Sequence, residues 1–261
     1  MNTEEIVVGL FCRVDDEMRD QTKHPDSLLW PSELMTIGLL FTLKGIAKRP
    51  FYRWLSANLG HLFPRLPDRT RLFRILLKLI SHVDRFMAPT TMVGFIDSYG
   101  IELTHPIRAS RSNRQIGHLG ISNHRWINGG KLCLLLNSQG LAVDWGFARA
   151  NTHDSMFRDM AEAVQDRMAV LTDTGFHGRE GDPINLGICK RGQCNVRMLI
   201  ETVFSMMTRM FHAKHMTVRT WPAFAMQLGL MAALFNLLVQ WHGMTPRQDG
   251  FVPISIAEFV I

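Results

Sequence analysis

The chain has 261 residues, of which 46% are hydrophobic, so it is long enough to bury one large core or two modest ones. Its formal net charge of +6 and its pI near 9.5 favour a polyanionic partner such as nucleic acid, although a basic pI alone does not prove one. No charged and then apolar signal peptide begins the chain, and the four cysteines are scattered, so the composition argues against a secreted, disulfide-rich protein. We therefore expect a reducing, cytoplasmic location.

The N-terminal third of the sequence predicts helices. Apolar runs at 34–43 and 52–59 each end near a glycine, and 64–68 reads as a turn. The clearest helix starts near Asp68 and has an apolar stripe that continues to Val83. Arg71, Arg74 and Lys78 share another face of this helix, which predicts either a DNA-end-binding surface, such as a helix-turn-helix variant, or a solvated helix face.

The middle of the chain predicts a mixed sheet. An apolar run at 92–96 leads into Asp97 and Ser98-Tyr99-Gly100, which reads as a strand, an acid and a turn. Runs at 131–136 and 141–148 predict a hairpin, and a buried strand at 168–171 precedes Asp173. A further short strand is predicted within 183–190. Between strands, Arg108, Arg111 and Arg114 lie in a basic loop that is suited to phosphate contacts.

Helices are predicted after the hairpin and towards the C-terminus. His153-Asp154-Ser155 precedes a periodic segment that reaches Val164, so Asp154 or Ser155 should cap a helix. We expect Asp154 to be the cap, with a role as a fourth acid as the alternative. We expect His153 to be structural. The apolar run at 223–241 contains polar interruptions and barely reaches spanning length, which favours a buried core or dimer helix over a membrane span.

Four residues could be combined into a zinc site: Cys189, Cys194, His212 and His215. Neither their spacing nor the helix predicted between them is a strong zinc pattern, so we expect free thiols, as for Cys12 and Cys133.

Three acids form a better candidate site. Asp97 and Asp173 each follow a predicted strand, and Glu201 lies off the apolar stripe of an amphipathic helix predicted around 196–210. Hard divalent cations need several oxygen ligands, and two such ions held by shared carboxylates can stabilise the attacking and leaving oxygens of phosphoryl transfer. The alternative is that the aspartates only form turns and that Glu201 is a solvated surface group.

The motifs around these acids resemble those of the DDE transposases of bacterial insertion sequences. F-I-D-S resembles the segment of the first Asp, L-T-D-T-G-F-H-G that of the second Asp, and R-M-L-I-E-T-V-F-S that of the Glu. A-N-T-H-D-S and W-I-N-G-G-K-L are similar to two further motifs of the family, and all of them occur in the family's order over about residues 60–240. Three positions differ from the usual motifs: Cys194 stands for Tyr, Thr174 for Lys, and Thr208 for a basic residue that Arg209 can replace.

The resemblance implies an α/β fold with a ribonuclease H-like mixed sheet flanked by helices and an N-terminal helical region. It divides the chain into a helical region (1–90), a catalytic domain with closing helices (91–243) and a tail (244–261). It implies that Asp97, Asp173 and Glu201 are the catalytic residues and the ligands of two Mg²⁺ or Mn²⁺ ions. Lys131, Arg197 and Arg209 are expected to join the basic residues above in contacting DNA.

The activity that the resemblance implies is cleavage of DNA at the ends of an insertion sequence and joining of the 3′-hydroxyl to target DNA. The expected partners are double-stranded DNA and further copies of the chain in a homodimer or higher synaptic complex, without a membrane. The alternative is a catalytically decayed or domesticated relative that binds DNA without cutting it.

Overall fold

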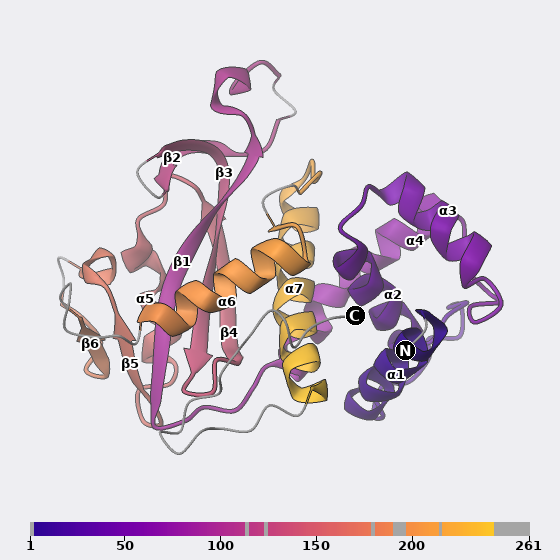
Figure 1. The fold of residues 1–261 in the computed structure, drawn as a ribbon, viewed down its shortest axis with the longest axis horizontal. Coiled ribbons are helices and arrows are strands. Elements are labelled where there is room, and N and C mark those ends of the chain that lie inside the picture. The colour runs from indigo at the N-terminus through magenta and orange to yellow at the C-terminus, as the bar shows by residue number, and fades with distance from the viewer. Residues whose placement is uncertain are drawn as a thin grey trace.

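The computed structural model describes residues 3–112, 115–122, 125–178, 181–189, 197–213 and 216–242. The fold is α/β, with a six-stranded mixed sheet that has helices on its faces and a group of N-terminal helices at one side (Figure 1). The predicted tail at 244–261 lies outside the described residues.

Five helical segments precede the sheet. They are α1 (Thr3–Glu17), α2 (Pro31–Lys44), α3 (Lys48–Asn58), α4 (Arg69–Leu76) and the 3-10 helix η1 (Leu77–Phe86). The helices predicted at 34–43 and 52–59 are confirmed as parts of α2 and α3, whereas α1 was not predicted. Gly45 ends α2 with a left-handed backbone (φ 58°), which a glycine adopts without steric cost.

The helix predicted from Asp68 begins as expected but changes its pitch. The Asp68 carboxylate accepts hydrogen bonds from the amides of Thr70 and Arg71, at 3.0 and 3.1 Å, and so caps α4. From Leu77 onward the chain forms η1 instead of continuing the α-helix. The apolar stripe is nevertheless buried, since Leu72, Leu76, Leu79 and Val83 all pack in the core.

The sheet contains three antiparallel pairings and two parallel ones. Its strands are β1 (Val93–Thr104), β2 (His118–Ser122), β3 (Arg125–Asn137), β4 (Ala142–Arg149), β5 (Ala169–Thr172) and β6 (Leu186–Ile188). One edge of β3 pairs with β1, and its other edge pairs first with β2 and then with β4, always antiparallel. Strand β5 runs parallel to β1, and β6 runs parallel to β5. The predicted hairpin and the short strand within 183–190 are confirmed; β2 was not predicted.

The predicted end of the first strand at Asp97 is wrong. Strand β1 continues through Ser98-Tyr99-Gly100 to Thr104 and stays paired with β3. Gly100 is needed for close packing and not for a turn, because a Cβ on Gly100 would clash with the Ser122 side chain. Asp97 therefore lies within a long strand.

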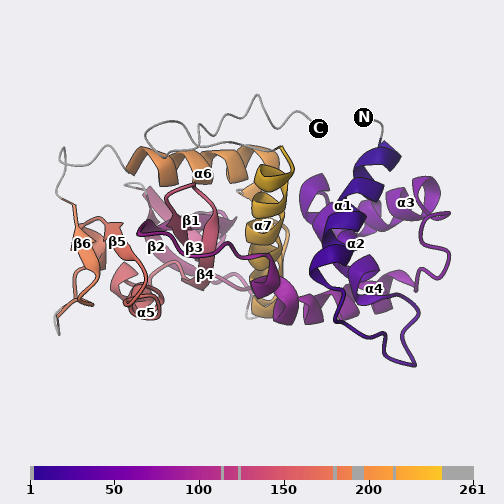
Figure 2. The same cartoon turned by 90° about the horizontal axis from the view of Figure 1, so that it is seen from below.

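Two helices cover opposite faces of the sheet (Figure 2). Helix α6 (Arg197–Met210), which agrees with the predicted amphipathic helix, packs on one face. The other face has a smaller core under the 3-10 helix η3 (Asp154–Phe157) and α5 (Arg158–Glu162). The single helix predicted up to Val164 is thus two short helical segments followed by a turn.

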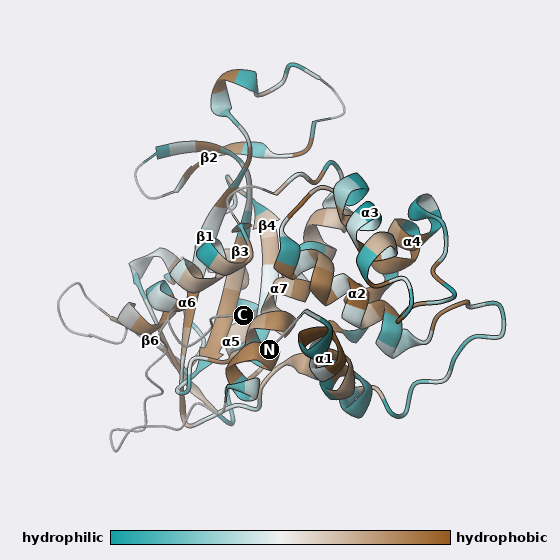
Figure 3. Ribbon diagram, turned by 45° about the vertical axis from the view of Figure 1, so that its right-hand side comes forward, coloured by the Kyte–Doolittle hydropathy of each residue, from teal (hydrophilic) through white to brown (hydrophobic). Residues whose placement is uncertain are grey.

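Helix α7 (Trp221–Trp241) lies between the sheet and the N-terminal helices (Figure 1). It is long and apolar enough to cross a membrane, but 94% of its most apolar window is buried inside the protein. This confirms the predicted buried core helix, and Figure 3 shows that α7 and α2 are largely hydrophobic. One continuous core includes side chains from α1, α2, α7 and the sheet, so residue 90 does not separate two hydrophobic cores.

Candidate active site

Asp97 lies within β1, and Asp173 follows directly after the end of β5, the strand that runs parallel to β1. Val93 pairs with Ala169, and the register continues without a shift through the next two pairs. In each of these pairs the residue on β5 follows its partner on β1 by 76 positions. The hydroxyl of Thr172 donates a 2.9 Å hydrogen bond to the carbonyl of Ile96, and these two residues are also 76 positions apart. Continued by one residue beyond β5, the same spacing of 76 residues sets Asp173 opposite Asp97.

Both aspartates belong to the face of the sheet that α6 covers. Along β1, Phe95 packs in the core under α6 while Ile96 packs in the core under α5, so the alternation returns Asp97 to the α6 side. Along β5, Leu171 packs against the core under α6, and Asp173, two residues later and still extended, follows it. Sequence alternation and parallel register therefore bring the two carboxylates to one region.

Backbone amides hold one oxygen of each aspartate. Oδ1 of Asp97 accepts a 2.7 Å hydrogen bond from the amide of Ser98, and Oδ1 of Asp173 accepts a 2.8 Å bond from the amide of Gly175. The second bond caps the short 3-10 helix η4 (Thr174–Phe176). Both aspartates are half-buried, so they are accessible while their side chains are held in place.

Glu201 lies on α6 and is exposed, as its position off the apolar stripe predicts. One turn after Glu201, the Phe204 ring stacks on the ring of Tyr99. One turn further on, the Thr208 hydroxyl donates a 3.2 Å hydrogen bond to the Tyr99 hydroxyl. Because Tyr99 follows Asp97 by two residues on the same side of β1, α6 crosses the sheet beside Asp97. Within the described ranges, no three acidic, His or Cys side chains already form a metal-binding group.

Asp154 does not cap a helix, contrary to the prediction. The cap of η3 is His153, whose Nδ1 accepts a 3.3 Å hydrogen bond from the amide of Ser155. Oδ1 of Asp154 instead accepts hydrogen bonds from the Ser98 hydroxyl at 2.6 Å and from Nζ of Lys131 at 2.7 Å. Nothing in the residues around Ser98 indicates this role, because the contact joins segments 56 residues apart.

Lys131 does not lie where a DNA contact was expected. It is only 8% exposed, and its ammonium group points to Asp154 from the middle of β3. The expectation that Lys131 contacts phosphate therefore does not fit this structure, in which its charge is taken up by a carboxylate.

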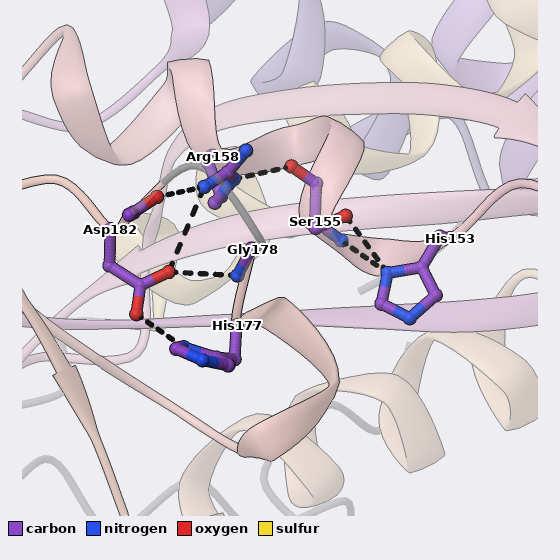
Figure 4. A network of polar contacts seen from close by, with 7 residues as sticks. His153, Ser155, Arg158, His177, Gly178 and Asp182 are labelled. Atoms are coloured by element: carbon purple, nitrogen blue, oxygen red, sulfur yellow. Dashed lines mark hydrogen bonds and ion pairs between the residues drawn. The ribbon is translucent and has the colours of Figure 1, made fainter.

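The loop after Asp173 is held by a polar network centred on Asp182 (Figure 4). The amide of Gly178 donates a 3.0 Å hydrogen bond to Asp182, and this bond, with a second one from His177, lowers the carboxyl pKa of Asp182. Arg158 joins the network through Asp182 and the carbonyl of Gly181. The Arg158 guanidinium occupies the space where a Cβ on Gly178 would lie, so this position has no room for a side chain.

The predicted basic face lies beside a hollow in the N-terminal helices. Arg71, Arg74 and Lys78 line a cavity of about 520 Å³ together with the segment 21–27. All three are exposed, and Arg71 donates a 3.4 Å hydrogen bond to the carbonyl of Asp26. The side chains of Arg74 and Lys78 make no hydrogen bond or ion pair within the described part of the chain. The three side chains therefore share one surface, although the chain changes from the α-helix α4 to the 3-10 helix η1 between Arg74 and Lys78.

Three of the other arginines that were predicted to contact DNA are exposed. Arg108 and Arg111 are exposed on the segment that projects between β1 and β2 (Figure 1), while Arg114 lies outside the described residues. Arg209 is exposed on the last turn of α6. Arg197 begins α6, but its side chain lies outside the described part of the chain.

The cysteines include one buried thiol. Cys133 is fully buried in β3, and burial, followed by the negative charges of Asp97 and Asp154, raises its pKa well above the usual value. Cys12 is exposed and is a free thiol, as expected, and Cys189 is half-buried and forms no disulfide within the described residues. Cys194 and His215 of the rejected zinc combination lie outside the described residues.

Comparison with known proteins adds no relative. No protein-family model matches the chain, and no curated protein matches it either. The candidate site consequently depends on the motifs of this chain and on the geometry described above.

Proposed function

We propose that this protein is a DDE transposase, which cuts DNA at the ends of an insertion sequence and joins the 3′-hydroxyl to target DNA. The observation that supports this most strongly is the parallel pairing of β1 with β5, because its register, if continued past Thr172, brings Asp173 opposite Asp97. A helix bearing Glu201 packs on the same face of the sheet, through the Tyr99–Phe204 contact. The three acids that the motifs select thus come from segments that converge.

We also propose that the core is ribonuclease H-like. The strand order β4-β3-β1-β5-β6 supports this, because three antiparallel strands are followed by two strands parallel to the first. In this arrangement the first strand is central and carries the first acid, Asp97. The next strand to pair with it, β5, carries the second acid at its end.

In this proposal Asp97, Asp173 and Glu201 hold two Mg²⁺ or Mn²⁺ ions. The donors fit such ions, since they are carboxylate oxygens, two of them half-buried on one face of the sheet. Bound metal ions would activate water or the 3′-hydroxyl and stabilise charge on the phosphate oxygens. The protein's own contribution is to orient the carboxylates, which the Ser98 and Gly175 amides already do for the two aspartates.

DNA is the proposed partner, and the basic surfaces are the proposed contacts. Arg71, Arg74 and Lys78 would bind the backbone of an element end, and Arg108, Arg111 and Arg114 would hold phosphates nearer the catalytic core. Arg197 and Arg209, on the helix of Glu201, would hold phosphate beside the acids. Because two element ends must be brought together, we propose that the active form is a homodimer or higher synaptic complex, acting in the cytoplasm.

A second candidate function is DNA binding without cleavage, as in a catalytically decayed or domesticated relative. Thr174 and Thr208 favour it, because they stand where the family's motifs carry basic residues. In addition, Thr208 is half-buried and its hydroxyl bonds to Tyr99, so the position cannot present a basic group to DNA without losing this contact. Arg209, which is exposed, is the residue that would compensate.

The experiment that separates the two functions is cleavage of an end-containing duplex by the purified protein. Short inverted repeats that bracket the coding region would supply the sequence of the ends. Cleavage that requires Mg²⁺ or Mn²⁺ and leaves a 3′-hydroxyl supports the transposase. Specific binding of the same duplex without cleavage under any divalent metal supports the second candidate.

A further inference from the structure

A partly buried ion pair lies behind Asp97, on the other face of the sheet, with 10% of the Lys131 side chain and 27% of the Asp154 side chain exposed. Lys131, which is 8% exposed, donates a 2.7 Å hydrogen bond from Nζ to Oδ1 of Asp154, and the Ser98 hydroxyl donates to the same oxygen at 2.6 Å. The three residues belong to β3, η3 and β1. A single carboxylate oxygen therefore joins three elements that are distant in the sequence.

This ion pair is linked to both candidate aspartates. On one side, the amide of Ser98, whose hydroxyl bonds to Asp154, donates to Asp97. On the other side, a Cβ built on Gly175 would lie 3.4 Å from Oδ2 of Asp154 and 3.0 Å from Oδ1 of Asp173. The two oxygens of Asp154 thus face the two backbone segments that hold the candidate metal ligands.

The energetics argue against a purely stabilising role. Lys131 loses most of its contact with water and Asp154 loses a large part of it, which is costly, and replacing a desolvated ion pair by apolar side chains of similar size is often neutral or stabilising. A hydrogen-bonded, partly buried pair does, however, restrict the geometry of the elements that it joins. Groups that orient metal ligands commonly affect metal affinity by about 10- to 100-fold.

We propose that Asp154, neutralised by Lys131, is a positioning residue that sets the separation of Asp97 and Asp173 for divalent metal binding. This inference rests on the proposed function, because it assumes that these two aspartates bind metal. Asp154 acts through Ser98 and through the Gly175 turn. Lys131 supplies the positive charge that lets a third carboxylate lie close to the other two without repelling them.

Two variants separate positioning from stability. Asp154→Asn keeps an acceptor for Ser98 but removes the charge that Lys131 pairs with. The double variant Lys131→Met/Asp154→Leu replaces the pair by apolar groups, so it is expected to remain folded while the link to Ser98 is lost. Asp144→Asn is the matched control, because Asp144 is a partly buried acid on β4 that lies outside this network.

The first measurement is Mn²⁺ binding to the full chain, followed by the electron paramagnetic resonance signal of free Mn²⁺. We expect the dissociation constant to rise at least about tenfold in Asp154→Asn and in the double variant, and to stay unchanged in Asp144→Asn. The melting temperature of the double variant should remain close to that of the wild type. Wild-type Mn²⁺ affinity in a folded double variant would overturn the inference.

The second measurement is amide hydrogen exchange without metal in residues 97–99 and 173–176. Faster exchange in both segments of the Asp154 variants, but not in Asp144→Asn, is expected if Asp154 positions them. If the wild type binds no Mn²⁺, the metal part of the proposed function fails, and exchange alone decides the positioning role. Unchanged exchange in both segments would then overturn that role.

Discussion

The ring of Tyr99 on β1 stacks on the ring of Phe204 on α6, with their centroids 5.2 Å apart and their planes inclined by 22°. This contact fixes where α6 crosses the sheet. It joins β1, which carries Asp97, to α6, which carries Glu201. The hydroxyl of Tyr99 also accepts a hydrogen bond from Thr208. One aromatic side chain therefore links the strand that carries Asp97 to the helix that carries Glu201.

Phe204→Ala should destabilise the protein and displace α6. Removing a buried Phe leaves a cavity and costs about 3–5 kcal/mol, whereas Phe204→Leu, which refills much of the volume, should cost clearly less. Urea unfolding measures both values. A loss below about 1 kcal/mol for Phe204→Ala would show that α6 is held mainly by other contacts.

Asn236→Leu should be strongly destabilising. Asn236 is fully buried in α7, accepts a hydrogen bond from the amide of Ala142, and donates to the carbonyls of Ala142 and Phe86, each at 2.8 Å. Leu removes all three bonds; the Ala142 carbonyl keeps its 2.8 Å bond from the Ala88 amide, whereas the Ala142 amide loses its Asn236 acceptor, and a buried group left without a partner costs about 1–3 kcal/mol. Gln227→Leu on the same helix is the control and should cost less. Equal losses for the two variants in thermal unfolding would contradict this role of Asn236.

DNA affinity should fall steeply as the salt concentration rises. Each phosphate neutralised by Arg or Lys releases counterions, so Arg74→Ala and Lys78→Ala should each lower the slope of log K against log salt by about 1. Arg53→Ala, an exposed arginine on α3 that does not line the hollow, should leave the slope unchanged. Fluorescence anisotropy over a salt series tests this, and an affinity that does not change with salt would exclude the electrostatic surface.

Arg209→Ala should weaken the binding of element ends or strand transfer by about tenfold, the value of one charge-assisted contact to phosphate. Arg209→Lys should retain most of the activity, because it keeps the positive charge. Band-shift and strand-transfer assays with the same duplex measure both effects. Wild-type behaviour of Arg209→Ala would show that Arg209 does not replace the family's basic residue.

Part of the fold was predictable because its signals are local. The hairpin of β3 and β4, the strand before Asp173, the amphipathic α6 and the apolar α7 all follow from periodicity and turn residues within one segment. The position of Glu201 on the exposed side of α6 also follows from the helical period alone.

Other features depend on contacts between distant segments and left no local signal. Gly100 looks like a turn residue, yet it lies within β1 because β2 packs against it. Asp154 has the sequence context of a helix cap, but Ser98 and Lys131, on two other strands, bind its carboxylate. The burial of Lys131 likewise depends on its strand having partners along both edges.

The most direct test of the proposed catalytic site is cleavage by single alanine variants of Asp97, Asp173 and Glu201. Nearby carboxylates repel one another unless a cation lies between them, so the site should require metal and be stabilised by it. We predict that each variant stays folded and binds DNA but does not cleave an end-containing duplex with Mg²⁺ or Mn²⁺, and that Ca²⁺ supports little cleavage by the wild type. Cleavage at the wild-type rate by any one of the three variants would contradict the role of that residue and the site as proposed.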